Sequence, residues 1–327
     1  MKFSLKAFDS LTNESEFSRH ALALFEYQFE HNAVYRSYCD LINTNPSEVQ
    51  NITEIPFLPI QFFKSHKVFS TGISSKKYFE SSGTTGQIRS KHYFSDLSLY
   101  HKSFEKGFEI FYGPIKDYAL LALLPSYLER EHSSLVYMAN ELIQKTEHPS
   151  SGFYLDEWDQ LKHTLKDLEN KNQKTILLGV SFALLEAVEN YDWNLKNTLV
   201  METGGMKGMR KEWIRSALHN RLKEGFGVES IHAEYGMTEL LSQAYSKADG
   251  IFYCPPWMHV STRAPEDPFE IQSLGKTGGL NIIDLANIDS CAFIATQDLG
   301  IIHSDGGFEV LGRFDQAEVR GCNLMVV

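Results

Sequence analysis

An unbroken apolar run at residues 175–180 (TILLGV) limits the possible folds of this chain more than any other stretch. A strand with one face in water alternates apolar and polar residues, whereas a continuous apolar run is typical of a strand buried on both faces. Leucine and valine follow at helical spacing, at 184, 185 and 188, and Ser181 is expected to cap this helix. The segment therefore predicts a buried strand that leads directly into a helix.

The same succession of strand and helix occurs on both sides of this segment. Residues 118–124 form an earlier apolar run, and residues 158–168 carry an apolar helical face. Residues 199–202 predict another short strand, followed by a helix whose apolar face begins with Trp213 and Ile214. Repeated strand–helix units favour an α/β fold with a largely parallel sheet.

Helical and extended segments are predicted ahead of this α/β region. Residues 14–32 place apolar side chains at helical spacing, with Asn13 or Ser15 as the capping residue. The proline-punctuated residues 55–60 (IPFLPI) predict an extended entry segment, because a residue that precedes proline is pushed away from the helical region.

The pattern changes to short strands after residue 250. Glycine, aspartate and asparagine separate three strand candidates, at 280–283, 292–295 and 308–311. We expect a single domain over residues 1–327, because no linker separates the two regions. Its subdomains are an α/β part at about 1–250 and a β-rich part with a C-terminal arm at about 251–327.

Charge, cysteines and hydropathy argue against several functions. The net charge is -11, and a field of this sign repels nucleic acid and anionic lipid surfaces. The four cysteines form neither a CxxC pair nor a cluster with zinc spacing. The N-terminus lacks the apolar core of a signal peptide, and no apolar run is long enough for a membrane span. We therefore expect a cytoplasmic protein without nucleic-acid partners.

A glycine-rich loop is the strongest local signal of a binding site. Its residues are Ser81, Ser82, Gly83, Thr84, Thr85 and Gly86. Small residues allow tight turns, and successive N–H groups of such a loop can hold phosphate oxygens. Arg89 and Lys91 follow and add positive charge. The loop matches neither a Walker loop nor a dinucleotide fingerprint, and by itself such a run is more often an ordinary surface loop.

Four motifs that follow one another along the chain, the first of which contains this loop, indicate its function. They are YFESSGTTGQIRSKHY at 78–93, HAEYGMTE at 232–239, ATQDLG at 295–300 and GRFD at 312–315. Each resembles a motif of the adenylate-forming superfamily, which contains acyl-CoA synthetases and luciferases. The resemblance implies the large α/β domain of that superfamily, with a small β subdomain at its C-terminal end.

The resemblance also implies a site for ATP and Mg²⁺. Thr84, Thr85 and the surrounding loop would hold the β- and γ-phosphates, with Arg89 adding charge. Thr238 would contact the α-phosphate, and Glu239 would bind the metal. Mg²⁺ usually retains several waters, so one glutamate can suffice. Formation of an acyl-adenylate needs alignment and charge stabilisation more than proton transfer, which agrees with these residue types.

The same resemblance assigns the nucleoside end of the site. Tyr235 would stack against adenine, and Asp298 would hold the ribose hydroxyls. Arg313 lies where a ribose-binding arginine is expected. The glycines implied in the cofactor site are Gly204, Gly205 and Gly236.

The end of the chain restricts the resemblance to one branch of the superfamily. Typical members of the superfamily continue for about another hundred residues, into a small domain that carries a catalytic lysine, whereas this chain stops at Val327. The early stop, with EVRGC at 318–322, resembles the LuxE-type acyl-protein synthetases, which load a fatty acid onto their own cysteine and deliver it to a partner. By position Cys322 would be the acyl acceptor, and the nearby Arg313 and Arg320 would favour its thiolate.

Three interpretations of the motifs stay open. The first is ATP-dependent activation of a carboxylic acid, fatty by resemblance, with transfer to Cys322 and then to a partner protein. The second is an acid–CoA or acyl-carrier ligase without its small domain. The third is a homologue that binds a nucleotide or an acyl group without turnover, against which the retained Thr238 and Glu239 argue.

Overall fold

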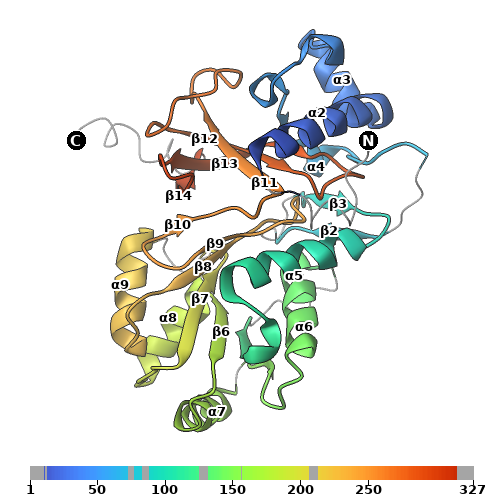
Figure 1. Cartoon of the computed structure of the whole chain (residues 1–327). Coiled ribbons are helices and arrows are strands. Elements are labelled where there is room, and N and C mark those ends of the chain that lie inside the picture. The colour runs from blue at the N-terminus through green and yellow to red at the C-terminus, as the bar shows by residue number, and fades with distance from the viewer. Residues whose placement is uncertain are drawn as a thin grey trace.

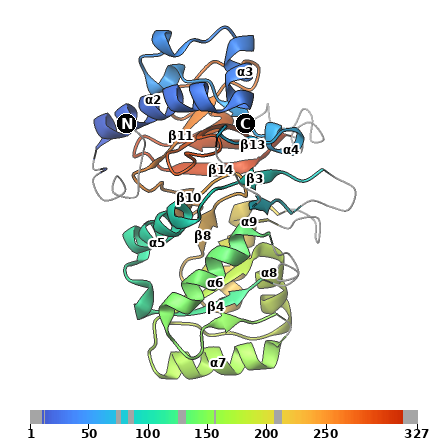
Figure 2. The ribbon, with the colours of Figure 1, turned by 90° about the vertical axis from the view of Figure 1, so that its right-hand side faces the viewer.

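Two β-sheets, one largely parallel and one largely antiparallel, organise the chain (Figure 1). The computed structural model of the protein describes residues 11, 13–72, 77–82, 88–124, 132–155, 157–205 and 213–314. The largely antiparallel sheet lies above the parallel one in Figures 1 and 2, with helices against both. The region between the sheets is therefore reached by segments from both halves of the chain.

The largely parallel sheet has the strand order β5–β4–β6–β7–β8–β9. Its strands are β4 (Ala119–Leu123), β5 (Gly152–Phe153), β6 (Thr175–Val180), β7 (Thr198–Thr203), β8 (His232–Tyr235) and β9 (Ala244–Ser246). All neighbouring strands are parallel except β8 and β9. Every residue of β4 and β6 is buried, as their unbroken apolar runs predict.

Helices cover both faces of this sheet. Two lie on one side, α5 (Ser98–Tyr112) and α6 (Ser134–Thr146), and two on the other, α8 (Ser181–Asn190) and α9 (Arg215–Phe226) (Figure 1). The helix α7 (Trp158–Asn170) connects β5 to β6, and a 3₁₀ turn at Ile115–Asp117 precedes β4. This arrangement confirms the predicted α/β fold.

The largely antiparallel sheet has the order β10–β14–β13–β12–β11. Its strands are β10 (Ile251–Phe252), β11 (Met258–Arg263), β12 (Thr277–Asp284), β13 (Phe293–Ile302) and β14 (Phe308–Arg313). The predicted extended segment contributes β1 (Leu58–Pro59), which pairs in parallel with β13. A separate hairpin consists of β2 (Tyr78–Glu80) and β3 (Lys91–Tyr93). The C-terminal strands thus lie where the sequence predicts them.

The N-terminal helices pack on the antiparallel sheet (Figure 1). Phe25 contacts Phe293 edge-on, with 6.1 Å between the ring centroids, and the Gln28 side chain donates to the Asn287 carbonyl at 2.7 Å. The predicted cap Asn13 accepts the amide of Glu16. The elements of this region are α2 (Glu14–His31), α3 (Ala33–Leu41), α4 (Phe62–Ser65) and 3₁₀ turns at Pro46–Glu48 and Ile52–Glu54.

Two predictions about helix starts were wrong. Ser181 does not cap α8, because its hydroxyl donates to the buried carboxylate of Glu202, a charged and therefore stronger acceptor. Trp213 and Ile214 do not lie on the face of α9, which begins at Arg215. Both are exposed, Ile214 by 72%, and both line the cavity described below.

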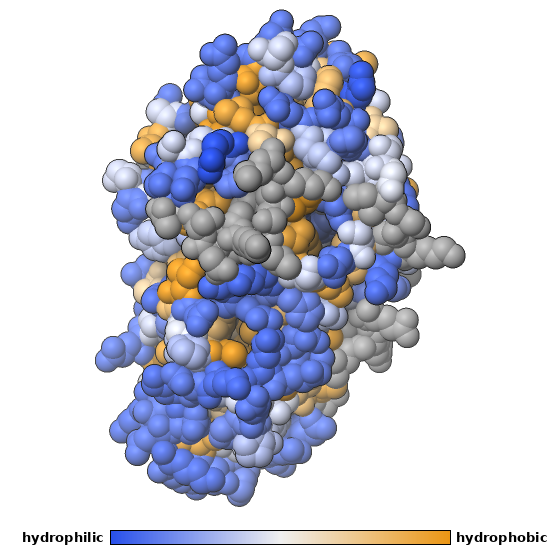
Figure 3. Space-filling view, turned by 45° about the vertical axis from the view of Figure 1, so that its right-hand side comes forward, coloured by the Kyte–Doolittle hydropathy of each residue, from blue (hydrophilic) through white to orange (hydrophobic). Residues whose placement is uncertain are grey.

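The face of the molecule in Figure 3 is mostly hydrophilic, and its apolar areas are small and separated. Within the described part of the chain, no helix is long and apolar enough to cross a membrane.

Candidate active site

A cavity of about 480 Å³ lies where the two sheets meet. It is lined by the segments that follow β7 and β8 and by residues of β13 and β14. In open α/β sheets, ligands bind at the carboxyl ends of parallel strands. Ten predicted site residues line this cavity together: Ser81, Ser82, Gly204, Gly205, Tyr235, Gly236, Thr238, Glu239, Asp298 and Arg313.

Only one of the other predicted site residues, Arg89, is described by the structure. Arg89 lines a neighbouring cavity and binds Glu80, with 2.9 Å between the guanidinium nitrogen and the carboxylate oxygen. Gly83, Thr84, Thr85, Gly86 and Cys322 lie outside the described residues. The cavity therefore contains the residues predicted for the nucleoside and the metal, together with the first two serines of the loop.

Tyr235 of β8 and Asp298 of β13 form one of the links between the two sheets. The Tyr235 hydroxyl donates to Asp298 Oδ2 at 2.8 Å, and the tyrosine ring packs against Phe252 and Phe308. Burial raises the pKa of Asp298, although Tyr235 and the neighbouring arginines act in the opposite direction. Asp298 therefore presents an acceptor oxygen, already fixed by a hydrogen bond, to the cavity.

Arg313 lies beside Asp298 on the adjacent strand, where the two residues are paired in register. Its Nε is 3.9 Å from Asp298 Oδ1, and its guanidinium donates to Gln297 Oε1 at 3.1 Å. Half of the Arg313 side chain stays exposed, at 52%. The carboxylate and the guanidinium thus offer an acceptor and several donors side by side, which suits a ribose or a phosphate oxygen.

Glu239 is one of the buried carboxylates of the cavity, with 5% of the residue exposed. Burial raises its pKa, while a hydrogen bond with Ser90 and the charges of Lys64 and Arg313 partly oppose this effect. A cation nearby stabilises the ionised form of a buried carboxylate that lacks a full counter-charge. Glu239 is placed to hold one.

Among the described residues, the donor set at Glu239 is compatible with Mg²⁺ and does not supply a metal site made of protein ligands alone. No group of three or more His, Cys, Asp or Glu side chains that could hold a metal occurs among the described residues. Mg²⁺ keeps several waters and is commonly held by one or two carboxylates together with substrate phosphates. A single buried glutamate fits that requirement.

His92 on β3 positions the segment that carries Thr238 and Glu239. Its Nδ1 is 2.8 Å from the Thr238 carbonyl oxygen, and its Nε2 is 2.7 Å from Ser290 Oγ. Burial lowers the pKa of His92 to about 4, so the ring is neutral near pH 7. A neutral imidazole with one N–H and one lone pair can satisfy both partners, which ties the hairpin to the motif.

Asp284 at the end of β12 fixes the next residues of the same segment. Its carboxylate accepts the amides of Leu241 and Ser242 at 2.8 and 2.9 Å, the Ser242 hydroxyl at 2.5 Å and the Ala286 amide at 3.0 Å. Asp284 is fully buried, and burial raises its pKa despite these four donors. The conformation of the loop after Glu239 therefore depends on the carboxylate of Asp284.

Replacing Asp284 by alanine should lower the free energy of unfolding by about 3 kcal/mol, since buried donors then lose their acceptor. The matched control is Asp267→Ala, an exposed aspartate that accepts one amide, from Phe269, at 2.9 Å. We expect the control to change stability by less than about 0.5 kcal/mol. Urea unfolding measures both, and equal effects would contradict the assigned role of Asp284.

Two glycines of the cavity have different steric requirements. A Cβ on Gly236 would lie 2.5 Å from Glu234 Oε1, and Glu234 is itself buried and hydrogen bonded to the Thr203 hydroxyl. A Cβ on Gly205 would meet no atom within 4 Å. Gly204 has a positive φ of 68°, which favours glycine at that position.

Gly236→Ala should therefore lower the free energy of unfolding by about 1–2 kcal/mol, because Glu234 must leave its place beside Thr203. Gly205→Ala should change it by less than about 0.5 kcal/mol. Denaturant titrations of the two variants provide the comparison. A Gly205→Ala variant as unstable as Gly236→Ala would mean that the loop, and not the contact with Glu234, sets the requirement.

A buried ionic cluster forms around Glu202, two positions ahead of the glycine pair Gly204 and Gly205. Glu202 at the end of β7 accepts from Arg215 at 3.0 Å and lies 3.8 Å from His219 Nε2. Burial would raise the pKa of Glu202, but His219, Arg215 and Ser181 together lower it. The supporting roles of this cluster and of Asp284 were not predicted, because their partners are distant in sequence. Ser90 and His92 lie in the first motif, but nothing in that motif indicates which residues they contact.

Solved structures with the same fold identify the class. A 2-hydroxyisobutyryl-CoA ligase in complex with 2-HIB-AMP superposes with a TM-score of 0.66 at 13% identity, over 93% of this chain and 69% of that one. ATP-bound MatB from Rhodopseudomonas palustris has a TM-score of 0.56 at 18% identity, over 72% of this chain. The chain spans about half the length of MatB, 47%. The protein therefore shares the fold of these two enzymes.

The sequence comparisons give the family. The chain belongs to the acyl-protein synthetase family LuxE, whose family model matches residues 7–327. A long-chain-fatty-acid–luciferin-component ligase from Aliivibrio fischeri is 24% identical, over 92% of this chain and 85% of that protein. The predicted resemblance is confirmed, and so is the prediction that the chain is an enzyme of the acyl-protein synthetase class.

Proposed function

We propose that this protein uses ATP to activate a long-chain fatty acid as an acyl-adenylate and then transfers the acyl group to the thiol of Cys322. From there the acyl group passes to a partner protein. The main support is the cavity that brings Thr238 and Glu239 together with Tyr235, Asp298 and Arg313. The Aliivibrio fischeri relative is named as a long-chain-fatty-acid ligase, which supports a fatty acid as substrate.

The first step displaces pyrophosphate from ATP. A carboxylate oxygen of the fatty acid bonds to the α-phosphorus, the bond from this phosphorus to the bridging oxygen breaks, and pyrophosphate leaves with the electron pair. Asp298 and Arg313 would hold the ribose, and Thr238 would align the α-phosphate. Mg²⁺ bound by Glu239 would supply positive charge to the phosphates. These groups position and stabilise charge and need not move a proton.

The second step moves the acyl group to sulfur. The Cys322 thiolate bonds to the acyl carbonyl carbon, AMP leaves with the electron pair of the broken C–O bond, and a thioester results. A thiolate is a strong nucleophile, so the protein has only to deliver it to the adenylate. A nucleophile on the partner protein then bonds to the acyl carbonyl carbon, the C–S bond breaks, and the Cys322 thiolate leaves and is free for another cycle.

A second, narrow cavity is the candidate entrance for the acyl chain. It shares Gly204, Gly236 and Thr238 with the first cavity, and its mostly polar lining also includes the apolar side chains of Leu135 and Met138. Its volume of about 80 Å³ corresponds to roughly three water molecules. A long acyl chain must therefore displace these side chains, and acids of different length should bind with different affinity.

ATP–pyrophosphate exchange over a series of acids tests the activation step. We expect exchange with long-chain fatty acids, weaker exchange with short and aryl acids, and a mass increase of one acyl group on the intact protein, removed by hydroxylamine. Exchange without acylation, with AMP release only after CoA or a carrier is added, would favour the ligase interpretation. Absence of exchange with every acid would contradict activation itself.

A further inference from the structure

A buried side-chain oxygen without a hydrogen-bond partner belongs to the narrow cavity beside the active site. Gln243, which directly precedes β9, lines this cavity and is only 5% exposed. Its Oε1 is buried and receives no hydrogen bond from the described residues. An unpaired acceptor in a protein interior is costly and rare, so a ligand that brings a donor to it gains affinity.

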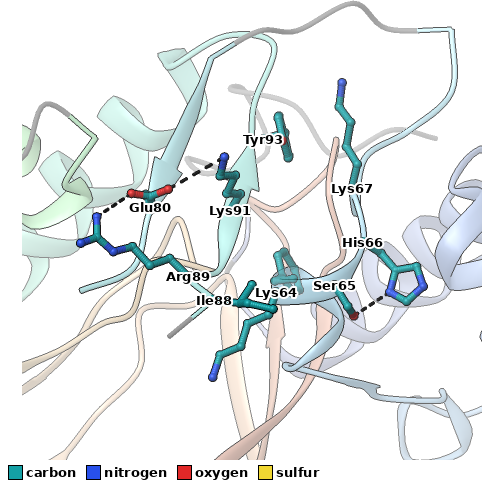
Figure 4. Close-up of a pocket in the computed structure, with 10 residues that line it drawn as sticks. Lys64, Ser65, His66, Lys67, Glu80, Ile88, Arg89, Lys91 and Tyr93 are labelled. Atoms are coloured by element: carbon teal, nitrogen blue, oxygen red, sulfur yellow. Dashed lines mark hydrogen bonds and ion pairs between the residues drawn. The ribbon is translucent and has the colours of Figure 1, made fainter. Parts of the chain in front are cut away.

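The two carboxylates in the described lining of the narrow cavity already have donors. Glu80 also borders the neighbouring cavity, where Arg89 and Lys91 extend to it (Figure 4). Glu234 accepts the hydroxyl of Thr203. Unlike these carboxylates, the glutamine oxygen lacks a donor, and it is therefore the acceptor that a substrate can complete.

The position of Gln243 decides which part of the acid it meets. A Cβ on Gly236 would lie 3.4 Å from Gln243 Cγ, so the glutamine side chain lies beside this glycine. Gly236 and Thr238 line both the narrow cavity and the active-site cavity, and Thr238 would align the α-phosphate that the acid attacks. With a volume of about 80 Å³, the narrow cavity has room for only the carboxyl end of an acid. Gln243 therefore meets the acid close to its carboxyl group.

A hydroxyl group is the donor that fits this position. A neutral amide oxygen accepts from a hydroxyl without any change of charge. An ammonium group would be costly to bury, because both carboxylates of the described lining already have donors. An unsubstituted methylene chain has no donor and leaves the oxygen of Gln243 unpaired, which is how a polar site rejects an analogue without the hydroxyl.

We propose that the preferred substrate is a hydroxy fatty acid, with its hydroxyl on one of the first carbons after the carboxyl group, and that Gln243 determines this preference. The hydroxyl donates to Gln243 Oε1 while the carboxylate reaches the α-phosphorus. This inference rests on the proposed function for the reaction and narrows its substrate class. Gln243 binds the substituent and takes no part in making or breaking bonds.

ATP–pyrophosphate exchange with three acids of equal length tests the preference. The acids are dodecanoic acid and its derivatives with a hydroxyl on the second or the third carbon. We expect kcat/KM for at least one hydroxy acid to exceed that for dodecanoic acid about fivefold, the effect of one neutral hydrogen bond. Gln243→Met should bring this ratio close to one, because a thioether of similar length is only a weak acceptor.

Gln272→Met is the matched control. The Oε1 of Gln272 is also buried without a partner among the described residues, but Gln272 lines neither the narrow cavity nor the active-site cavity. This variant should keep the full ratio. Equal exchange with all three acids, as expected if a water completes Gln243, would overturn the inference, and so would a ratio that survives Gln243→Met or that falls equally in the control.

Two measurements without turnover separate this inference from the proposed function. Calorimetric titration of the same acids uses protein saturated with the ATP analogue that has a methylene bridge between the α- and β-phosphates. A binding preference lost in Gln243→Met, with no exchange for any acid, would overturn the proposed function alone, whereas exchange without any preference would overturn the inference alone. Urea unfolding should show Gln243→Met to be at least as stable as the original protein, because an unpaired buried oxygen is removed. A clearly less stable variant would mean that this oxygen already has a partner, which contradicts the inference.

Discussion

Cys322→Ser should abolish covalent acylation of the protein and leave ATP–pyrophosphate exchange within about twofold of the original rate. Exchange reports adenylate formation, which needs no thiol, whereas the thioester requires the sulfur atom. A serine hydroxyl is nearly isosteric but far less nucleophilic at neutral pH, because it remains protonated. Intact mass after incubation with ATP, Mg²⁺ and fatty acid measures the first effect, and radioactive exchange measures the second.

The three described cysteines are poor alternatives as acyl acceptors. Cys39 and Cys291 are fully buried, and burial raises the pKa of Cys39 to about 12. Burial also raises the pKa of Cys254 and Cys291. A thiol with a raised pKa is mostly protonated and inert. Cys254→Ser, the least buried of the three, is therefore the matched control and should acylate normally; acylation that survives in Cys322→Ser would contradict the relay.

The parts of the fold that follow from local pattern were predictable. Residues 175–180 form β6 because a continuous apolar run makes both faces of a strand apolar, and both are then buried. The start of α9 was not predictable in the same way. Trp213 and Ile214 fit a helical period, but they line the cavity ahead of the helix, and only the assembled sheet shows that this space exists.

The candidate site also contains residues that local sequence predicts and residues that depend on the assembled fold. Tyr235, Thr238, Glu239, Asp298 and Arg313 lie in short motifs, so the sequence could name them, and the fold brings them to one cavity. Which residues hold these motifs in place could not be predicted, even for His92, which lies in the first motif. His92 is 146 positions from its partner Thr238, and a buried histidine in a short strand looks like any other core residue.

Asp284 illustrates why such supports stay hidden. It lies in an apolar strand, where an aspartate predicts a strand end, and its four donors come from residues that are 2 or about 42 positions away. No spacing rule links these positions, because the contact depends on how β12 lies beside the loop after Glu239. The chemistry of a site can be read from motifs, whereas its support depends on tertiary packing.

Glu239→Gln should reduce ATP–pyrophosphate exchange by about two to three orders of magnitude, the usual cost of removing one group that stabilises transition-state charge. Glutamine keeps the size and one acceptor oxygen of glutamate but loses the negative charge that would hold Mg²⁺. The loss should be partly recovered at high Mg²⁺ concentration if binding of the metal is the step affected. Glu105→Gln, which breaks a surface ion pair with Lys145, serves as the control and should exchange normally.

The stability of Glu239→Gln should separate a catalytic role from a structural one. Burial raises the pKa of Glu239 above its ordinary value of 4.5, so the folded state binds this proton more tightly than the unfolded state does. The stability that Glu239 contributes is therefore fully present below pH 4.5 and is lost as the pH rises through the raised pKa.

At pH 7, without metal, Glu239→Gln should be at least as stable as the original protein, and this advantage should vanish below pH 4.5. Denaturant titrations at the two pH values measure it. A variant that is both inactive and clearly less stable at pH 7 would mean that Glu239 supports the fold, and the exchange defect could then no longer be assigned to the metal.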